Sequence, residues 1–346
     1  MVQEIQIEDE KWDRIVKSFE RYDIFYLNHY VKAFYKEGDG VPLLIYVENE
    51  KCRGINVVMR RDIADDNIFI GKIEKNKYYD IRSPYGYGGF WLEGDKEEFQ
   101  RIIEEYIEYC LKSEYVCEFV RFELLEPFYK LYYGEVETRS HNIIRSLEMP
   151  IEDMLFDFEH KVRKNLKRGI EYGLKIIIDN TGEYLEDFLR IYYGTMKRTG
   201  AENNFYFSRS FFETINRMCE NIIYFHVVYE DKIISSELVL YGTENAYSYL
   251  GGTDSEYFPM RPNDFLKFEA IKWLKEKGLK NFILGGGYGT DDGIFHYKKS
   301  FSPNGVVNFY IGKKIFSEKK YQELLQIRKE EKEFNAESSF FPLYRA

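Results

Sequence analysis

The histidines and cysteines of this chain are not spaced as in a metal site or in a covalent catalytic mechanism. The five histidines are isolated from one another, and the four cysteines include no Cys-x-x-Cys pair. A metal needs its ligands close together, and a covalent mechanism needs a nucleophile beside a base. We therefore expect no metal site, four reduced cysteines and a reaction by direct attack of one substrate on the other.

The lysine pair in the segment FHYKKSF is the first candidate for catalysis. Lys298 lies between Phe295 and Phe301, and a cation fixed in such a setting can stabilise negative charge that develops during a reaction. Two solvated loop lysines are the alternative interpretation. If the segment is a strand, Lys298 and Lys299 point to opposite faces and only one of them can act. We assign Lys298 to catalysis and the neighbouring Tyr297 to substrate binding.

Two further segments combine tyrosines with glycines. The segment AYSYLGG predicts a strand with two tyrosines on one face, followed by glycines that let a substrate approach the backbone. The segment SPYGYGGF predicts a loop whose flat rings and hydroxyls suit sugars or peptides. Ordinary strand packing and an ordinary turn are equally good interpretations. We assign Tyr249 to catalysis and five residues to substrate binding: Tyr247, Gly251, Tyr85, Gly86 and Tyr87.

Positive charge is concentrated in one predicted helix, HKVRKNLKR. Such a helix could bind RNA or the phosphates of a nucleotide sugar, because both need several cations on one surface. A solvated charged face is the alternative interpretation. The basic residues of this helix are Lys161, Arg163, Lys164, Lys167 and Arg168.

Length and composition describe a folded protein. The chain has 346 residues, which suggests two domains, and its 44% hydrophobic and 31% charged residues exclude extensive disorder. The net charge of -10 excludes a general nucleic-acid coat protein but leaves room for a local basic patch. No apolar run reaches the ~20 residues that span a bilayer, and the N-terminus is acidic, unlike a signal peptide. We expect a cytoplasmic protein, and the sequence indicates no oligomeric state.

The elements that must position these residues follow a repeated order. Hydrophobic periodicity in the second half predicts a strand, two helices, three strands, a helix and a strand, with Ser210 and Glu213 as a capping box. The first half ends in the same way, with a hairpin, a strand and glycine loop, an amphipathic helix and a strand. This order predicts an α/β (α+β) fold of two lobes with mixed sheets flanked by helices. We place the first lobe at 1–149, the second, catalytic lobe at 150–315, and a helix and tail that pack on the first lobe at 316–346.

The order of elements in the second half matches the GNAT acyltransferase fold, and the local sequence resembles the Fem family. The similar segments, within 161–301, are KVRKNLKRGIEYGLKI, TMKRTGA, GGTDSEYFPMRPNDFLKFEAIKWLKEKGLKNFILGGG and FHYKKSF. The resemblance implies two tandem GNAT-like lobes and transfer of an aminoacyl group from tRNA to a peptidoglycan precursor. It also implies that Lys298 stabilises the oxyanion, and that Lys36 and Arg198 contact the phosphates of a nucleotide-linked precursor. The loop SPYGYGGF is similar to the matching loop of broader Fem-like acyltransferases.

The chain departs from acetyl-CoA-dependent GNAT enzymes at one turn. Those enzymes bind the pyrophosphate with a glycine-rich turn before the penultimate helix, where backbone N–H groups reach the phosphates. Here the turn reads FPMRPNDF, without glycine, and Pro262 has no N–H to donate. We therefore expect no permanently bound cofactor, with aminoacyl-tRNA as the donor and acyl-CoA as the less favoured alternative.

Three functions are compatible with these patterns. The first is a Fem-like transferase that moves an aminoacyl or acyl group onto an amine of a nucleotide-linked or lipid-linked cell-envelope precursor, with tRNA as a further candidate partner. The second is an acyl-CoA-dependent N-acetyltransferase acting on an amino sugar, which the FPMRPNDF turn disfavours. The third is a non-catalytic GNAT-like binding module, which the aromatic setting of Lys298 disfavours. We prefer the first.

Overall fold

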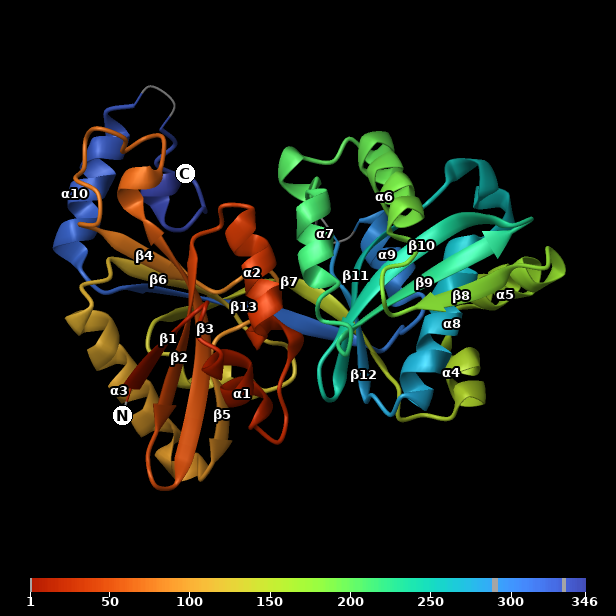
Figure 1. The fold of residues 1–346 in the computed structure, drawn as a ribbon, viewed down its shortest axis with the longest axis horizontal. Coiled ribbons are helices and arrows are strands. Elements are labelled where there is room, and N and C mark those ends of the chain that lie inside the picture. Colours follow the sequence, from red (N-terminus) through yellow and green to blue (C-terminus); the bar gives the residue numbers. More distant parts are fainter. Residues whose placement is uncertain (1, 288–291, 332–333) are drawn as a thin grey trace. The chain divides into compact units, whose positions relative to one another are not determined.

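The protein divides into two compact units, each built from strands and helices (Figure 1). The computed structural model describes residues 2–287, 292–331 and 334–346. The first unit holds Met1–Glu20, Phe25–Arg139 and Phe309–Ala346, and the second holds Arg21–Ile24 and Ser140–Asn308.

The strands of the first unit have the order β1-β2-β3-β4-β6-β13 in the sheet, and β5 pairs with β3. Its neighbours are antiparallel except β4 and β6, which are parallel because the connection between them crosses over through helix α3. The apolar stripe of α3 packs on alternate residues of β2, so that Ile45, Ile102 and Tyr106 share one buried core. The bounds are β1 (Val2–Gln6), α1 (Lys11–Lys17), α2 (Asn28–Lys36), β2 (Val41–Glu48), β3 (Cys52–Asp62), β4 (Tyr79–Arg82), β5 (Trp91–Gly94), α3 (Phe99–Lys112), β6 (Cys117–Arg121), β13 (Val306–Ile315) and α10 (Glu318–Lys329).

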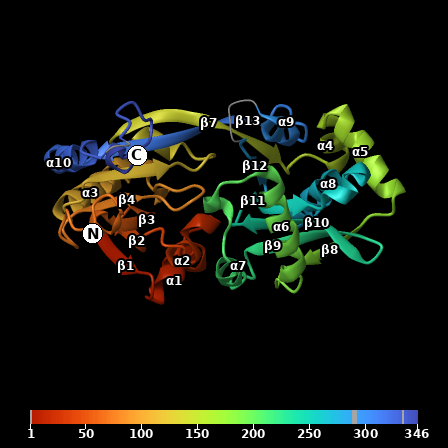
Figure 2. The same ribbon diagram turned by 90° about the horizontal axis from the view of Figure 1, so that it is seen from above.

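The strands of the second unit have the order β8-β9-β10-β11-β12-β7 in the sheet, again with one parallel pair. The crossover helix α8 makes β11 and β12 parallel, and the other neighbours are antiparallel. Helices α5 and α8 pack together on one face, and α6 contacts β10 and β11 from the other (Figure 2). The bounds are β7 (Glu135–Ser146), α4 (Ile151–Asp157), α5 (His160–Glu171), β8 (Lys175–Asp179), α6 (Leu185–Thr199), α7 (Arg209–Ile215), β9 (Ile222–Tyr229), β10 (Lys232–Tyr241), β11 (Asn245–Thr253), α8 (Pro262–Glu276), β12 (Asn281–Gly285) and α9 (Gly293–Lys299).

The predicted fold class, mixed sheets flanked by helices, is confirmed, and two local predictions need correction. Ser208 rather than Ser210 caps α7, because the Ser208 Oγ accepts the Phe211 N–H at 3.2 Å. The segment considered as a strand around Lys298 is helix α9, which begins where the Asp292 side chain accepts the Phe295 N–H at 2.8 Å. In the described part of the chain, no helix is long and apolar enough to cross a membrane.

The C-terminal tail is held in the first unit by a buried carboxylate. The Asp80 carboxylate accepts a hydrogen bond from the Tyr344 hydroxyl at 2.7 Å and forms ion pairs with Arg61 and Arg345, each at 2.7 Å. Burial raises the pKa of Asp80, but the two arginine charges outweigh it and hold the pKa below its usual value. The tail is therefore fixed by charge as well as by the fully buried ring of Tyr344.

Candidate functional site

Lys298 lies on the short helix α9, with its ammonium group enclosed by the protein. Phe295 and Phe301 are buried in the core of the second unit and fix this segment on both sides of the lysine. The Lys298 Nζ donates a hydrogen bond to the Gly286 carbonyl at 2.6 Å. Because the segment is helical, Lys298 and Lys299 are about 100° apart around one helix and do not point to opposite faces of a strand.

The surroundings of Lys298 disfavour its protonated form. Burial, and after it the positive charge of Lys267, lower the pKa of Lys298 to about 8, although the charges of Glu237 and Asp292 oppose the fall. The strand β12 ends at Gly285, which has a φ of +83°, and a Cβ there would lie 3.1 Å from the Lys298 Nζ. The positive φ thus favours a glycine at this position, and its missing side chain leaves room for the Lys298 ammonium.

A buried ion pair lies near Lys298, between helix α8 and the sheet. The Lys267 Nζ donates to both carboxylate oxygens of Glu237, at 2.5 and 2.7 Å, and to the Ser248 Oγ at 2.8 Å. The side chains of Lys267 and Glu237 are only 6% and 7% exposed. All three ammonium protons of Lys267 are therefore used, and its position is fixed.

Tyr297 brings an unused hydroxyl to the same region. Its oxygen is buried and has no hydrogen-bond partner among the described residues. Burial raises the pKa of Tyr297 well above its usual value, and the charges of Asp264 and Glu237 add to the rise. A buried hydroxyl without a partner is unfavourable unless a ligand or water completes it, so Tyr297 is suited to substrate binding.

Two of the strand residues assigned to substrate contact the protein itself. The Tyr247 hydroxyl donates to the buried Asp23 carboxylate at 2.6 Å. Burial raises the pKa of Asp23 to about 6, although the bond from Tyr247 opposes the rise. A Cβ on Gly251 would lie 2.6 Å from the Ser236 carbonyl oxygen, so the neighbouring strand occupies the space at this glycine. Tyr249 is half-buried where the pairing of β10 with β11 shifts register.

The basic helix α5 divides into a structural and a solvated part. The Arg163 guanidinium donates to the carbonyls of Leu155, at 3.3 Å, and Phe156, at 2.9 Å, and also to that of Phe158, so it caps the end of α4. Lys161 pairs with Glu159 at 3.1 Å. Lys164, Lys167 and Arg168 are exposed. Two lysines and one arginine therefore remain as a surface for an anionic partner.

The glycine loop of the first unit is well packed. The Tyr85 ring stacks on Phe34 at 5.6 Å between centroids and is 38% exposed, while the Tyr87 ring meets the edge of Phe25 at 5.3 Å. Gly86 has a φ of +91°, and a Cβ there would lie 2.4 Å from the Phe25 ring. The ring of Tyr85 is the part of this loop that remains accessible for a ligand.

The two residues matched to phosphate contacts are both exposed, Lys36 at the end of α2 in the first unit and Arg198 near the end of α6 in the second. The Arg198 guanidinium lies over the Phe258 ring at 5.0 Å from its centroid. An exposed guanidinium held over a ring keeps its donors available for an anion.

The first turn of α8 carries a carboxylate, Asp264, at the expected phosphate position, with Arg261 just before the helix. Arg261, with a φ of 60°, precedes Pro262 at the start of the helix, and Asp264 lies in the first turn. The Asn165 Nδ2 donates to the Asp264 carboxylate at 3.1 Å, and burial raises the pKa of Asp264. A proline without an N–H and a carboxylate in the first turn both weaken a helix N-terminus as an anion site.

Sequence reasoning missed Glu237, Lys267, Ser248 and Asp264. Glu237 interrupts the apolar strand IISSELVLY, and Lys267 interrupts the buried face of FLKFEAI. A single charge inside an apolar run is the signal that could have found this pair, because such a charge must have a buried partner. The partner of each residue lies 30 positions away, which periodicity alone cannot connect.

The comparisons with known proteins agree with this architecture. Residues 157–299 match the family described as an acetyltransferase (GNAT) domain. No curated protein matches the chain in sequence. The structure of FemX is similar with a TM-score of 0.68 and 14% identity, covering 93% of this chain and 99% of FemX.

Two further solved structures share the fold. The C-terminal domain (DUF2156) of a protein named as a lysylphosphatidylglycerol synthetase, from Agrobacterium fabrum, has a TM-score of 0.53 and 13% identity, covering 83% of this chain and 86% of its own. A conserved protein of unknown function from Bacteroides thetaiotaomicron has a TM-score of 0.59 and 11% identity, covering 90% and 99%. The expected similarity to Fem-like GNAT proteins is confirmed for the fold. The second unit of this chain contains a GNAT-type acyltransferase domain, within residues 157–299.

Proposed function

We propose that the second unit transfers an aminoacyl or acyl group to an amine of a cell-envelope precursor, either peptidoglycan or an amino sugar, by direct attack. The acceptor nitrogen bonds to the carbonyl carbon of the donor, and the ester bond to the carrier breaks. The carrier leaves with its hydroxyl, and the proton of the amine leaves through the substrate or water. The observation that carries this proposal is the enclosed ammonium of Lys298 beside the fixed Glu237–Lys267 pair.

Lys298 is proposed to stabilise the oxyanion. Only one of its three N–H donors is used within the described residues, by the Gly286 carbonyl. Because its pKa is about 8, Lys298 is protonated in most molecules at neutral pH. A charged donor in a site of low dielectric is most effective where negative charge develops in the transition state. Tyr297 and Tyr249 are proposed to position the substrate beside it.

We propose aminoacyl-tRNA as the donor. The negatively charged, proline-containing N-terminus of α8 disfavours the pyrophosphate of acyl-CoA, and the exposed cations Lys164, Lys167 and Arg168 offer a surface for RNA. Lys36 and Arg198 are proposed to contact a nucleotide-linked or lipid-linked acceptor. The similar fold of a protein named for lysylphosphatidylglycerol fits an aminoacyl group and an envelope molecule. Because charged tRNA is cytoplasmic, we propose that compartment for the reaction.

An acyl-CoA-dependent N-acetyltransferase acting on an amino sugar is the second candidate. The family description of residues 157–299 as an acetyltransferase (GNAT) domain favours it. A non-catalytic binding module is the least supported function, because such a module has no need for an enclosed lysine with a lowered pKa.

A transfer assay with the full chain distinguishes these functions. The donors are tRNA charged with labelled amino acids and labelled acetyl-CoA, and the acceptors are a UDP-linked muropeptide and glucosamine. We expect label on the muropeptide from charged tRNA and no saturable binding of acetyl-CoA by calorimetry. Tight stoichiometric binding of acetyl-CoA with acetylation of glucosamine would establish the second candidate. If no donor or acceptor binds, the proposed transfer is wrong.

A further inference from the structure

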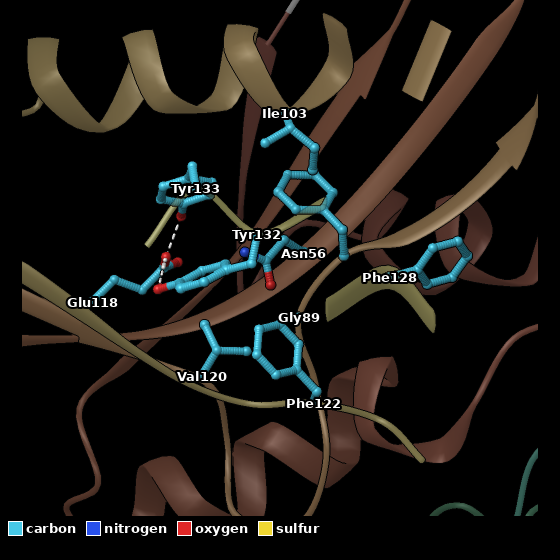
Figure 3. Close-up of a pocket in the computed structure, with 10 residues that line it drawn as sticks. Asn56, Gly89, Ile103, Glu118, Val120, Phe122, Phe128, Tyr132 and Tyr133 are labelled. Atoms are coloured by element: carbon cyan, nitrogen blue, oxygen red, sulfur yellow. Dashed lines mark hydrogen bonds between the residues drawn. The ribbon is translucent and has the colours of Figure 1, made fainter. Parts of the chain in front are cut away.

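The first unit contains a small cavity whose walls are mainly aromatic and which also holds polar side chains (Figure 3). Its volume of about 20 Å³ has room for one water-sized group or for the end of a chain. Gly89 and Phe90, at the end of the glycine loop, and Phe122, Phe128 and Tyr132 supply most of the wall. The polar groups are Glu118 on β6 and Asn56 on β3.

Glu118 is a buried carboxylate without a cation. Its Oε1 accepts the Tyr106 hydroxyl at 2.6 Å, and its Oε2 accepts the hydroxyls of Tyr132, at 3.2 Å, and Tyr133. Two carboxylate oxygens accept about four hydrogen bonds, so Oε1 retains acceptor capacity. Among the described residues, the groups that act on the Glu118 carboxylate are these three tyrosine hydroxyls, and none of them carries a positive charge. Burial raises the pKa of Glu118, although its bonds from the tyrosines, that of Tyr106 first, oppose the rise.

Asn56 is the second polar group of the cavity. Its side chain is drawn beside Tyr132 in the cavity (Figure 3), and the residue is 3% exposed. Within the described residues its carboxamide makes no hydrogen bond, and it lines the cavity. A buried carboxamide normally has partners, because its desolvation is otherwise uncompensated. The amide oxygen and the free site on Glu118 therefore form a pair of acceptors around an enclosed space.

We propose that this cavity binds a primary ammonium group, either free ammonium or the terminal amine of a larger ligand. An ammonium supplies N–H donors to the Glu118 carboxylate and the Asn56 oxygen, and it neutralises the buried charge. The faces of Phe and Tyr rings in the wall stabilise a cation further. A water molecule fits the volume but leaves the charge uncompensated. Among the described residues no group of three His, Cys, Asp or Glu could hold a metal ion.

This site is independent of the proposed transferase reaction. All of its residues belong to the first unit, whereas Lys298 and the Glu237–Lys267 pair belong to the second. Binding of an ammonium ligand can therefore be measured without donor or acceptor. Its failure leaves the transferase proposal unaffected, and the reverse also holds.

Calorimetry of the full chain with a series of small cations tests the proposal at pH 7.5. The series contains ammonium, methylammonium, butylammonium, potassium and tetramethylammonium chlorides. We expect ammonium or methylammonium to bind at least tenfold more tightly than potassium, and tetramethylammonium not to bind, because it lacks N–H donors and exceeds the cavity. Tighter binding of butylammonium than of ammonium identifies the end of a larger amine as the ligand, and the reverse order identifies free ammonium. Equal binding of potassium and ammonium, or no binding by any cation, overturns the proposal.

Variants of the two acceptors provide the control for specific binding. Glu118→Gln keeps the size of the side chain and removes the charge, and we expect at least a tenfold loss of affinity. Glu108→Gln, on the exposed face of α3, is the matched control and should bind as the wild type does. If Glu118→Gln does not fold, cation binding by Asn56→Leu tests the site instead. This variant replaces the amide with an apolar group of similar size and should abolish binding in a folded protein, so retained binding would refute the site.

The pH dependence of binding gives a further test. The carboxylate form of Glu118 binds the cation, and its pKa lies above the ordinary value of 4.5. Affinity should therefore rise with pH through the acid range and level off once Glu118 is ionised. Glu237, Lys267 and Lys298 lie in the other unit, and Tyr106, Tyr132 and Tyr133, which face Glu118, stay protonated throughout because burial raises the pKa of each. Affinity that does not change between pH 4 and pH 8 contradicts the role of Glu118.

Discussion

At the scale of single residues, the protonation state of Lys298 should control the pH dependence of kcat. If the protonated side chain stabilises the oxyanion, kcat should fall as the pH rises through about 8, the pKa to which burial and the charge of Lys267 lower it. Lys298→Arg keeps its charge at higher pH and should move this alkaline fall upward, with only partial activity because the guanidinium is broader. The measurement is kcat against pH between 6 and 10. A fall at the same pH in Lys298→Arg and in the wild type would assign the titration to another group.

The Glu237–Lys267 pair yields a prediction for stability. Lys267→Met leaves the Glu237 carboxylate buried without a cation, and we expect a loss of about 3–5 kcal/mol in the free energy of unfolding. The double variant Lys267→Met/Glu237→Leu removes both charges and should recover most of this loss. Lys112→Met is the control, since Lys112 pairs with Glu108 on the surface, and should change stability by less than about 1 kcal/mol. Urea unfolding measures all three. A double variant as unstable as the single one would show that the pair itself is needed.

At the scale of elements, helix α5 separates stabilising cations from those free to bind a partner. Arg163→Ala removes the hydrogen bonds to the end of α4, and we expect a loss of about 1.5–3 kcal/mol. Lys164→Ala, one residue further along the helix, should change stability by less than about 0.5 kcal/mol. Thermal unfolding compares the two. For tRNA, Lys164→Glu/Lys167→Glu should weaken binding with little effect on stability, and unchanged tRNA affinity would leave α5 as a solvated helix.

The order of the elements was predictable from the sequence, whereas their long-range contacts were not. The apolar stripes of α3 and α6 and the hairpin of β9 and β10 follow from local periodicity. Asp292 as the cap of α9 is also a local signal, since a side-chain oxygen at this position favours a helix over a strand around Lys298. The hydrogen bond from Tyr247 to Asp23 joins residues 224 positions apart, and no local sequence pattern predicts it. Lys298 was found by resemblance, but the residues that set its charge were found only in the structure.

At the scale of the whole molecule, the buried Asp80 joins the end of the chain to the first unit. Its pKa is lowered on folding, so its contribution to stability is present above the unfolded value of 3.8 and is lost as the pH falls through the folded pKa. Asp80→Asn should therefore cost about 3 kcal/mol at pH 7 and less at pH 3, which lies below the unfolded value. Urea unfolding of the variant and the wild type at the two pH values measures this. An equal loss at both pH values would mean that shape, and not charge, holds Arg345 and Tyr344.

The central claim is that the enclosed ammonium of Lys298 stabilises the transition state of acyl transfer, and its most direct test is the turnover of Lys298→Ala beside Lys299→Ala. Both variants remove a lysine from α9, but the contact with the Gly286 carbonyl is made by Lys298. With the donor and acceptor identified by the transfer assay, kcat of Lys298→Ala should fall on the order of a hundredfold or more, about 3 kcal/mol, with little change in KM. Lys299→Ala should retain wild-type kcat. Wild-type turnover in Lys298→Ala, or equal losses in the two variants, would contradict the account.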